Sequence, residues 1–110
     1  METSILTSIK KLLGVAEDYI EFDEDIITHI NSVLLNLNQL GVGPEEGFMI
    51  EDDTACWEDF IEDETKLQAV KSYIYLKVKL LFDPPLSSSV TESYNRMIAE
   101  LEWRLNVAID

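Results

Sequence analysis

The chain has 110 residues, of which 46% are hydrophobic, and it carries a formal net charge of −14 at pH 7. A chain of this length buries one hydrophobic core, so we expect a single folded domain over residues 1–110. The charge disfavours binding to nucleic-acid phosphates or to anionic membranes, because both need basic patches, and no apolar run is long enough to span a bilayer.

Two helices are predicted in the N-terminal part of the chain. The first covers about residues 4–13, where apolar side chains recur at helical spacing, and Gly14 ends it. The second covers about residues 23–40 and ends at Gly41; acids occupy its first turn, where the helix dipole favours negative charge. Its broad apolar face consists of Ile26, Ile27, Ile30, Val33, Leu34, Leu37 and Leu40.

An irregular acidic loop is predicted next, over residues 41–55, because glycines and a proline recur there. Within it, Phe48, Met49 and Ile50 form a short apolar piece that could be extended and pair with the edge of a partner. A short helix is expected over residues 54–63, with three apolar side chains on one side: Trp57, Phe60 and Ile61.

Two long helices are predicted in the C-terminal part, over residues 64–82 and 88–107. Pro84 and Pro85 cannot lie inside a helix, and Pro84 also biases Asp83 away from helical backbone, so the first of these helices stops there. The serines at positions 87–89 suit the N-cap of the next helix. In the helix over residues 64–82, the residues expected to face the core are Leu67, Val70, Ile74, Val78 and Leu81. Three more apolar residues widen this apolar belt to a second face of the helix: Tyr73, Leu76 and Leu80. In the helix over residues 88–107, the residues expected to face the core are Val90, Tyr94, Met97, Ile98, Leu101 and Leu105.

These elements predict an all-α fold. We expect a compact bundle of four principal helices, with an αα-hairpin around Asp83, Pro84 and Pro85 and the acidic loop before the third helix.

The apolar belt of the third helix is wide for so small a bundle. Tyr73 and Tyr75 lie about 200° apart around that helix, so both cannot face one core, and one is expected at a protein–protein contact. Two explanations remain open: an oligomer covers the second face, or Phe48, Trp57 and Phe60 cover it from within the chain. The candidate interface residues are Phe48, Met49, Ile50, Tyr73, Tyr75, Trp103 and Arg104.

The charge is unevenly placed along the chain. Residues 12–65 contain sixteen acids and no Lys or Arg, whereas six basic residues face five acids from Lys66 onward. Such a distribution indicates one surface that faces water or repels a negative molecule, and another that makes contacts.

No pattern of an enzyme or a metal site is present, and we expect no cofactor. The acidic runs diverge around their helices and lack the glycine and glutamate spacing of a calcium loop, so they are interpreted as solvated surface. His29, four residues after Asp25, is interpreted as a surface or edge histidine stabilised by that acid. Cys56 has no basic neighbour and is expected to be a small buried residue; a lone cysteine also fits a reducing cytoplasm.

Several segments together, in this order, resemble the small head–tail connector proteins of long-tailed bacteriophages, which prophages also carry. They are the short first helix ending at Gly14, Phe22–Ile27, Leu37–Gly43, Trp57–Phe60, Tyr73–Pro85 and Glu100–Leu105. The resemblance implies a structural subunit that forms a ring of about a dozen copies under the portal protein. Further neck or tail-completion proteins would bind the ring and DNA would pass through its lumen, in the virion neck and, during assembly, in the host cytoplasm.

An acidic wall would suit such a lumen, because it repels phosphate and lets DNA slide without sticking. Two other classes stay open. An acidic DNA mimic, or another protein-binding inhibitor, would also be small, helical and negative. A metal-dependent enzyme is the third class.

Overall fold

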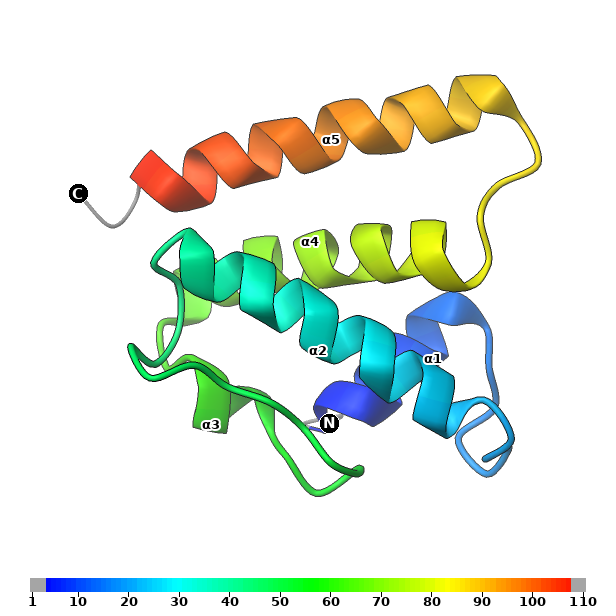
Figure 1. The fold of residues 1–110 in the computed structure, drawn as a ribbon, viewed down its shortest axis with the longest axis horizontal. Coiled ribbons are helices and arrows are strands. Elements are labelled where there is room, and N and C mark those ends of the chain that lie inside the picture. Colours follow the sequence, from blue (N-terminus) through cyan, green and yellow to red (C-terminus); the bar gives the residue numbers. More distant parts are fainter. Residues whose placement is uncertain (1–3, 108–110) are drawn as a thin grey trace.

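The computed structural model describes residues 4–107, and these form five helices and no β-strand. The helices are α1 (Ile5–Leu13), α2 (Asp23–Gln39), α3 (Trp57–Phe60), α4 (Glu64–Phe82) and α5 (Ser88–Val107). In Figure 1, α5 runs along the top, α2 lies in front and α4 lies between them. The prediction of an all-α fold with four principal helices is therefore correct.

Local signals place the helix ends. Ser4 caps α1, because its hydroxyl accepts a hydrogen bond of 3.2 Å from the Thr7 N–H. Gly14 ends α1 in the left-handed conformation, with φ of 83°, which costs a glycine little. Asp63 caps α4 by accepting from the Thr65 N–H, and the hydrogen bonds from Thr65 lower the pKa of the Asp63 carboxyl.

The αα-hairpin forms around the two prolines. Asp83 leaves the helix with φ of −148° and ψ of 71°, as the residue before a proline is expected to do. The Ser87 hydroxyl then accepts from the Val90 N–H at 3.4 Å in the first turn of α5. Figure 1 shows α4 and α5 running antiparallel from this corner.

Helix α4 is the centre of the bundle and packs against α1, α2 and α5. Its inward side chains are completely buried at Val70, Tyr73, Ile74 and Val78. Trp57 and Phe60 of α3 are buried in the same core, and Phe48 is partly buried against it. The wide belt of α4 is covered to a large extent from within the chain, because α1, α2 and α5 pack on it.

Leu12 of the predicted apolar stripe of the first helix is 51% exposed, and three residues of the two long C-terminal helices that were predicted to face the core are exposed as well. Leu81, Val90 and Met97 are 53%, 41% and 43% accessible. Val90 lies in the first turn of α5, next to the proline corner. Figure 1 shows α4 and α5 diverging toward that corner. Leu81 lies in the last turn of α4 beside the same corner, and Met97 lines a groove between the two helices.

The segment before α4 also differs from expectation. Helix α3 is a single turn, because Ile61 already has extended backbone with φ of −150°, and α2 ends one residue before the predicted Leu40. Cys56 is only partly buried and occupies the N-cap position of α3. No ion pair of the described residues joins Asp25 to His29, so the expected stabilisation of that histidine is not seen.

Gly43 and Gly47 offer a matched test of the loop. Both have positive φ, of 89° and 94°, but a Cβ at Gly43 would overlap the buried Phe60 ring, whereas one at Gly47 meets nothing within 4 Å. Gly43→Ala is therefore expected to lower the free energy of unfolding by about 2 kcal/mol, and Gly47→Ala by about 1 kcal/mol, the backbone cost alone. Urea unfolding measures both. Equal losses would show that the loop moves away from Phe60 at little cost.

Candidate protein interfaces

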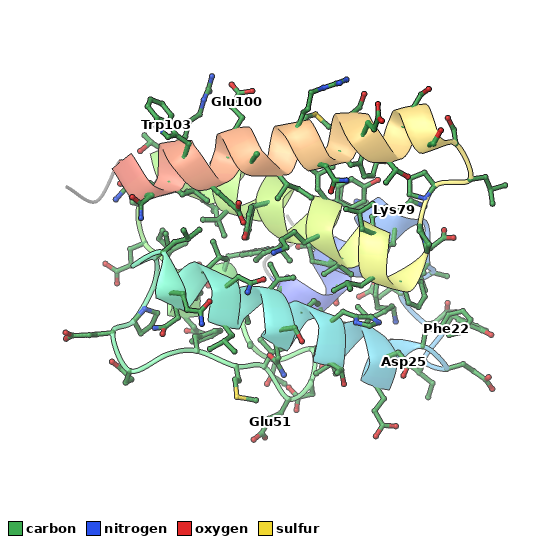
Figure 2. The ribbon with its side chains drawn as sticks, turned by 45° about the horizontal axis from the view of Figure 1, so that its top comes forward. Phe22, Asp25, Glu51, Lys79, Glu100 and Trp103 are labelled. Atoms are coloured by element: carbon green, nitrogen blue, oxygen red, sulfur yellow. The ribbon has the colours of Figure 1, made fainter. Side chains whose placement is uncertain are left out.

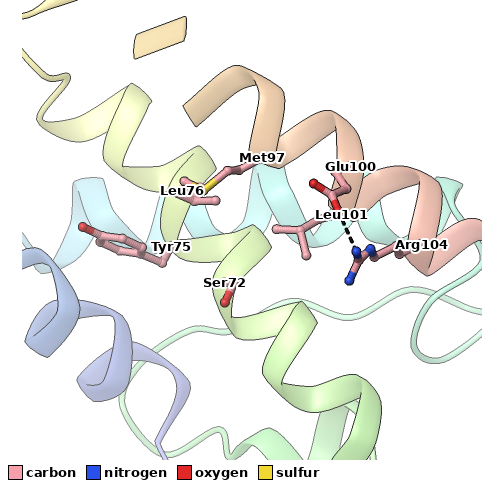
Figure 3. Close-up of a pocket in the computed structure, with 7 residues that line it drawn as sticks. All are labelled: Ser72, Tyr75, Leu76, Met97, Glu100, Leu101 and Arg104. Atoms are coloured by element: carbon pink, nitrogen blue, oxygen red, sulfur yellow. Dashed lines mark ion pairs between the residues drawn. The ribbon is translucent and has the colours of Figure 1, made fainter. Parts of the chain in front are cut away.

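A basic, apolar groove crosses α1, α4 and α5 and is the first candidate interface. Between α4 and α5 it has a volume of about 430 Å³, and Figure 3 shows the side chains that line it. It continues toward α1, because Ser72 and Tyr75 also line an adjacent hollow bounded by Lys11 and Leu12. We call this surface the basic face; its lining residues include Lys11, Leu12, Lys71, Tyr75, Met97 and Arg104.

Within residues 4–107, no acid forms an ion pair with Lys11 or Lys71 of the basic face. Glu100 is the one acid among its lining residues, and Glu100 Oε1 already forms an ion pair of 2.6 Å with Arg104 Nη2. Lys71 lies over the Trp57 ring at 5.4 Å, a cation–π contact that fixes it beside the groove. An acidic partner would find two cations on this face and no free carboxylate among the residues that line it.

A second groove lies between α2 and the loop that follows it. Leu34, Leu35, Phe48 and Met49 supply its apolar lining, and Leu35 and Met49 are 58% and 72% exposed. Glu46 lines it as well, and none of the described residues that line it is a Lys or Arg. We call this surface the acidic face: the groove together with the neighbouring exposed acids Glu45 and Glu51. Figure 2 shows Glu51 pointing outward from the loop.

Ile50 belongs to the core and does not serve as an exposed edge. Its side chain is 2% exposed, and the Asn31 amide satisfies both of its main-chain groups. Asn31 Oδ1 accepts from the Ile50 N–H at 2.8 Å, and Asn31 Nδ2 donates to the Ile50 carbonyl at 3.0 Å. The prediction that residues 48–50 pair with a partner's edge is therefore corrected at Ile50: an α2 side chain occupies the groups that such a strand would use.

Tyr73 is likewise buried, with no exposed surface, so the expected contact role can apply only to Tyr75. The Tyr73 hydroxyl donates to Glu102 Oε2 at 2.8 Å, and Lys77 Nζ donates to it at 3.4 Å and to Asn36 Oδ1 at 2.8 Å. Burial, followed by the Glu102 carboxylate, raises the pKa of Tyr73 well above its ordinary value of 10.0. This network joins α2, α4 and α5, and no pattern in the sequence indicates it.

The other predicted interface residues lie on the surface. Tyr75 is partly buried in the basic face, and burial, followed by the neighbouring Tyr94 hydroxyl, raises its pKa. Trp103 is 67% exposed, and Figure 2 shows it pointing away from α5 beside Glu100. Arg104 lines the basic face, and Phe48 and Met49 line the acidic face. The structure thus places Tyr75 and Arg104 on the basic face, Phe48 and Met49 on the acidic face and Trp103 outside both grooves. The interface role of these residues stays a prediction.

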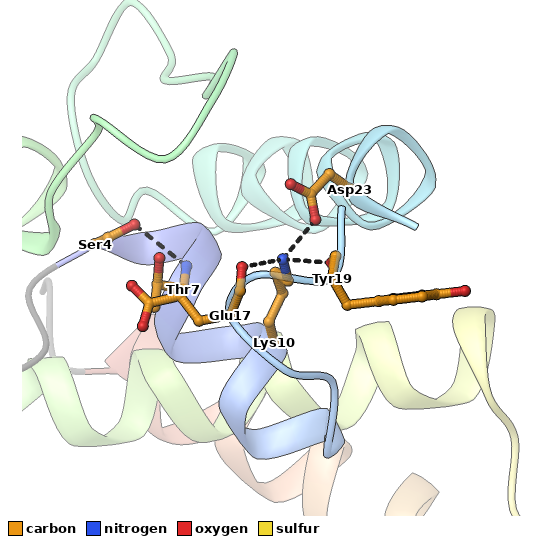
Figure 4. Close-up of polar contacts among 6 residues, drawn as sticks. All are labelled: Ser4, Thr7, Lys10, Glu17, Tyr19 and Asp23. Carbon is orange, nitrogen blue, oxygen red and sulfur yellow. Dashed lines mark hydrogen bonds and ion pairs between the residues drawn. The ribbon is translucent and has the colours of Figure 1, made fainter. Parts of the chain in front are cut away.

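Lys10 was missed as a structural residue. Lys10 is 2% exposed, and its Nζ forms an ion pair of 2.7 Å with Asp23 Oδ1. Among the described residues, this ammonium group is the partner that satisfies the buried oxygen. The same Nζ donates to the carbonyls of Glu17 and Tyr19 at 3.0 and 2.8 Å (Figure 4). Lys10 thus ties the loop after α1 to the start of α2. The sequence signal for this role was the position of Lys10 among apolar residues on one face of the first helix.

The acidic runs are exposed as expected, apart from Asp23, which Lys10 holds. Within residues 4–107, no three His, Cys, Asp or Glu side chains gather as metal ligands would. No helix in the same part of the chain is both long and apolar enough to cross a membrane.

The comparisons with known proteins give one result. The family model described as phage connector protein matches residues 5–110. No curated protein matches the chain, and no solved structure does.

Proposed function

The chain belongs to the phage connector family, whose role in the head–tail connection is structural, and we propose that it is a ring-forming subunit of the neck. In this proposal about a dozen copies close into a ring on the portal protein, and further neck or tail-completion proteins bind to that ring. The protein then resides in the virion neck and occupies the host cytoplasm during assembly. The observation that carries the proposal is a family match over nearly the whole chain.

The structure supports a role in assembly in two ways. The helical bundle covers its own core, so each copy can fold before it assembles. It also leaves two grooves with exposed apolar side chains, on surfaces of different charge. Exposed apolar side chains rimmed by polar ones are typical of protein-binding surfaces.

DNA passage through the ring is supported by the charge. The chain carries −14, and most acids of residues 12–65 are exposed. A ring of such subunits repels phosphate, and screening confines this repulsion to about 8 Å at physiological salt. DNA therefore passes close to the wall without binding it.

The proposal is tested by mixing the purified protein with the portal assembly of the same phage. We expect a stable complex whose mass, measured by light scattering, exceeds that of the portal by that of about a dozen subunits. Negative-stain images should show an added ring on the portal axis, and labelled DNA should not bind the free protein at physiological salt. Absence of any portal complex over a wide concentration range would overturn the proposal.

A further inference from the structure

The basic face and the acidic face lie on opposite sides of the bundle. Lys77 of α4 contacts Asn36 of α2, so this side of α4 faces α2. Tyr75 lies two residues earlier, about 200° around the helix, and therefore on the side turned away from α2. The acidic groove is formed by α2 and the loop that follows it. The two grooves thus flank the bundle with α4 and α2 between them.

The two faces are complementary in charge and similar in apolar character. Among the described residues, Lys11 and Lys71 of the basic face have no acidic partner, and Leu12 and Met97 are 51% and 43% exposed there. On the acidic face, Glu46 lines a groove in which Met49 is exposed. Each face therefore offers apolar area, with lysines outside ion pairs of the described residues on the basic face and a carboxylate on the acidic face.

We propose that the acidic face of one copy docks against the basic face of the next copy, head to tail. This inference rests on the proposed ring and names the two surfaces that build it. A two-fold contact of either face with itself would place like charges against each other, which opposes binding. A contact between two different faces leaves one of each free at the ends, and repetition with rotation closes a ring.

The net charge of each copy works against this contact at long range, whereas the facing patches attract at short range. A salt series changes both effects at once, because screening weakens repulsion and attraction together. Charge reversals at single positions within the two faces separate the long-range repulsion from the short-range attraction. Lys11 and Glu46 are suitable positions, because both side chains are exposed and neither belongs to the buried core.

The first experiment measures ring formation on the portal by Lys11→Glu, by Glu46→Lys and by the double variant. Each single change should raise the concentration needed for half-assembly about tenfold or more, because it places like charges in the contact. The double variant should recover most of the loss, since every interface then contains both reversed charges. Glu92→Lys, an exposed change of the same charge on α5, should assemble like the native chain. Single variants that assemble normally, or a double variant with no recovery, would overturn the proposal.

A second experiment tests the head-to-tail geometry in a Cys56→Ser background. Met49→Cys and Met97→Cys are combined in one chain, and portal-bound protein is treated with a short bis-maleimide. The double variant should give a ladder of covalent oligomers, whereas either single cysteine should give no cross-linked product. A dimer from a single cysteine would show a two-fold contact and overturn the inference. If the proposed ring does not exist, the native chain forms no complex with the portal. That result is seen before any variant is cross-linked, so it is distinguishable from a wrong choice of faces.

Discussion

Replacing Lys10 by methionine is expected to lower the free energy of unfolding by about 3 kcal/mol, which is a large fraction of the stability of a small domain. Methionine keeps the apolar stem of the lysine but removes the ammonium group. Asp23 Oδ1 and the carbonyls of Glu17 and Tyr19 then lose the donor that holds all three. Asp23 keeps 27% of its side chain exposed, so water recovers part of the loss and the expected cost lies at the lower end for a broken buried pair.

Lys11→Met is the matched control for this change. Lys11 follows Lys10 in the same last turn of α1, but its side chain is exposed. Its replacement is expected to change stability by less than about 0.5 kcal/mol, as is usual for surface positions. Urea unfolding followed by circular dichroism measures both variants. A Lys10→Met loss as small as that of Lys11→Met would show that the loop after α1 does not depend on the ammonium group.

Ile74→Ala is expected to cost about 2–5 kcal/mol of unfolding free energy, the range for deleting a large aliphatic side chain from a packed core. Ile74 has no exposed surface and lies in the part of α4 that faces the buried core. Because α1, α2 and α5 all pack on α4, they hold one another in place and cannot move inward to fill the cavity that the shortened side chain leaves. The cavity therefore adds to the lost transfer free energy.

Leu81→Ala provides the control on the same helix. The same apolar pattern placed Leu81 with Ile74, yet Leu81 is 53% exposed in the structure. We expect its replacement to cost about 1 kcal/mol or less, since much of the side chain already contacts water. Chemical denaturation of the two variants should separate them by at least 1 kcal/mol. Similar losses of unfolding free energy in the two variants would show that Leu81 is buried, which would contradict its exposure at the end of α4.

The four principal helices and most of their ends were predictable because their signals are local, whereas the extent of α3 was not. Gly14, the Asp83–Pro85 corner and the Ser87 cap each act on backbone within a few residues, and each lies where the structure ends or begins a helix. The resemblance to phage connectors was also carried by such short segments in order, and the family match over residues 5–110 confirms it.

The division of the candidate interface into buried and exposed residues was not predictable from the same pattern. Tyr73 and Ile50 are apolar enough to suit a contact, but Glu102 and Asn31, from α5 and α2, bind their polar groups and hold them inside. Helical spacing shows which residues share a face of a helix. It does not show which neighbouring helix covers that face.

Composition and spacing were therefore sufficient for the all-α class, the αα-hairpin and the exposed acids, because propensity, caps and solvation act on each segment separately. The tertiary structure alone decided that Lys10 is buried, that Leu81, Val90 and Met97 are exposed, and that Lys11 and Lys71 line one groove whereas Glu46 lines another. These features depend on contacts between segments distant in the chain. Burial and charge complementarity arise only once such segments are packed together.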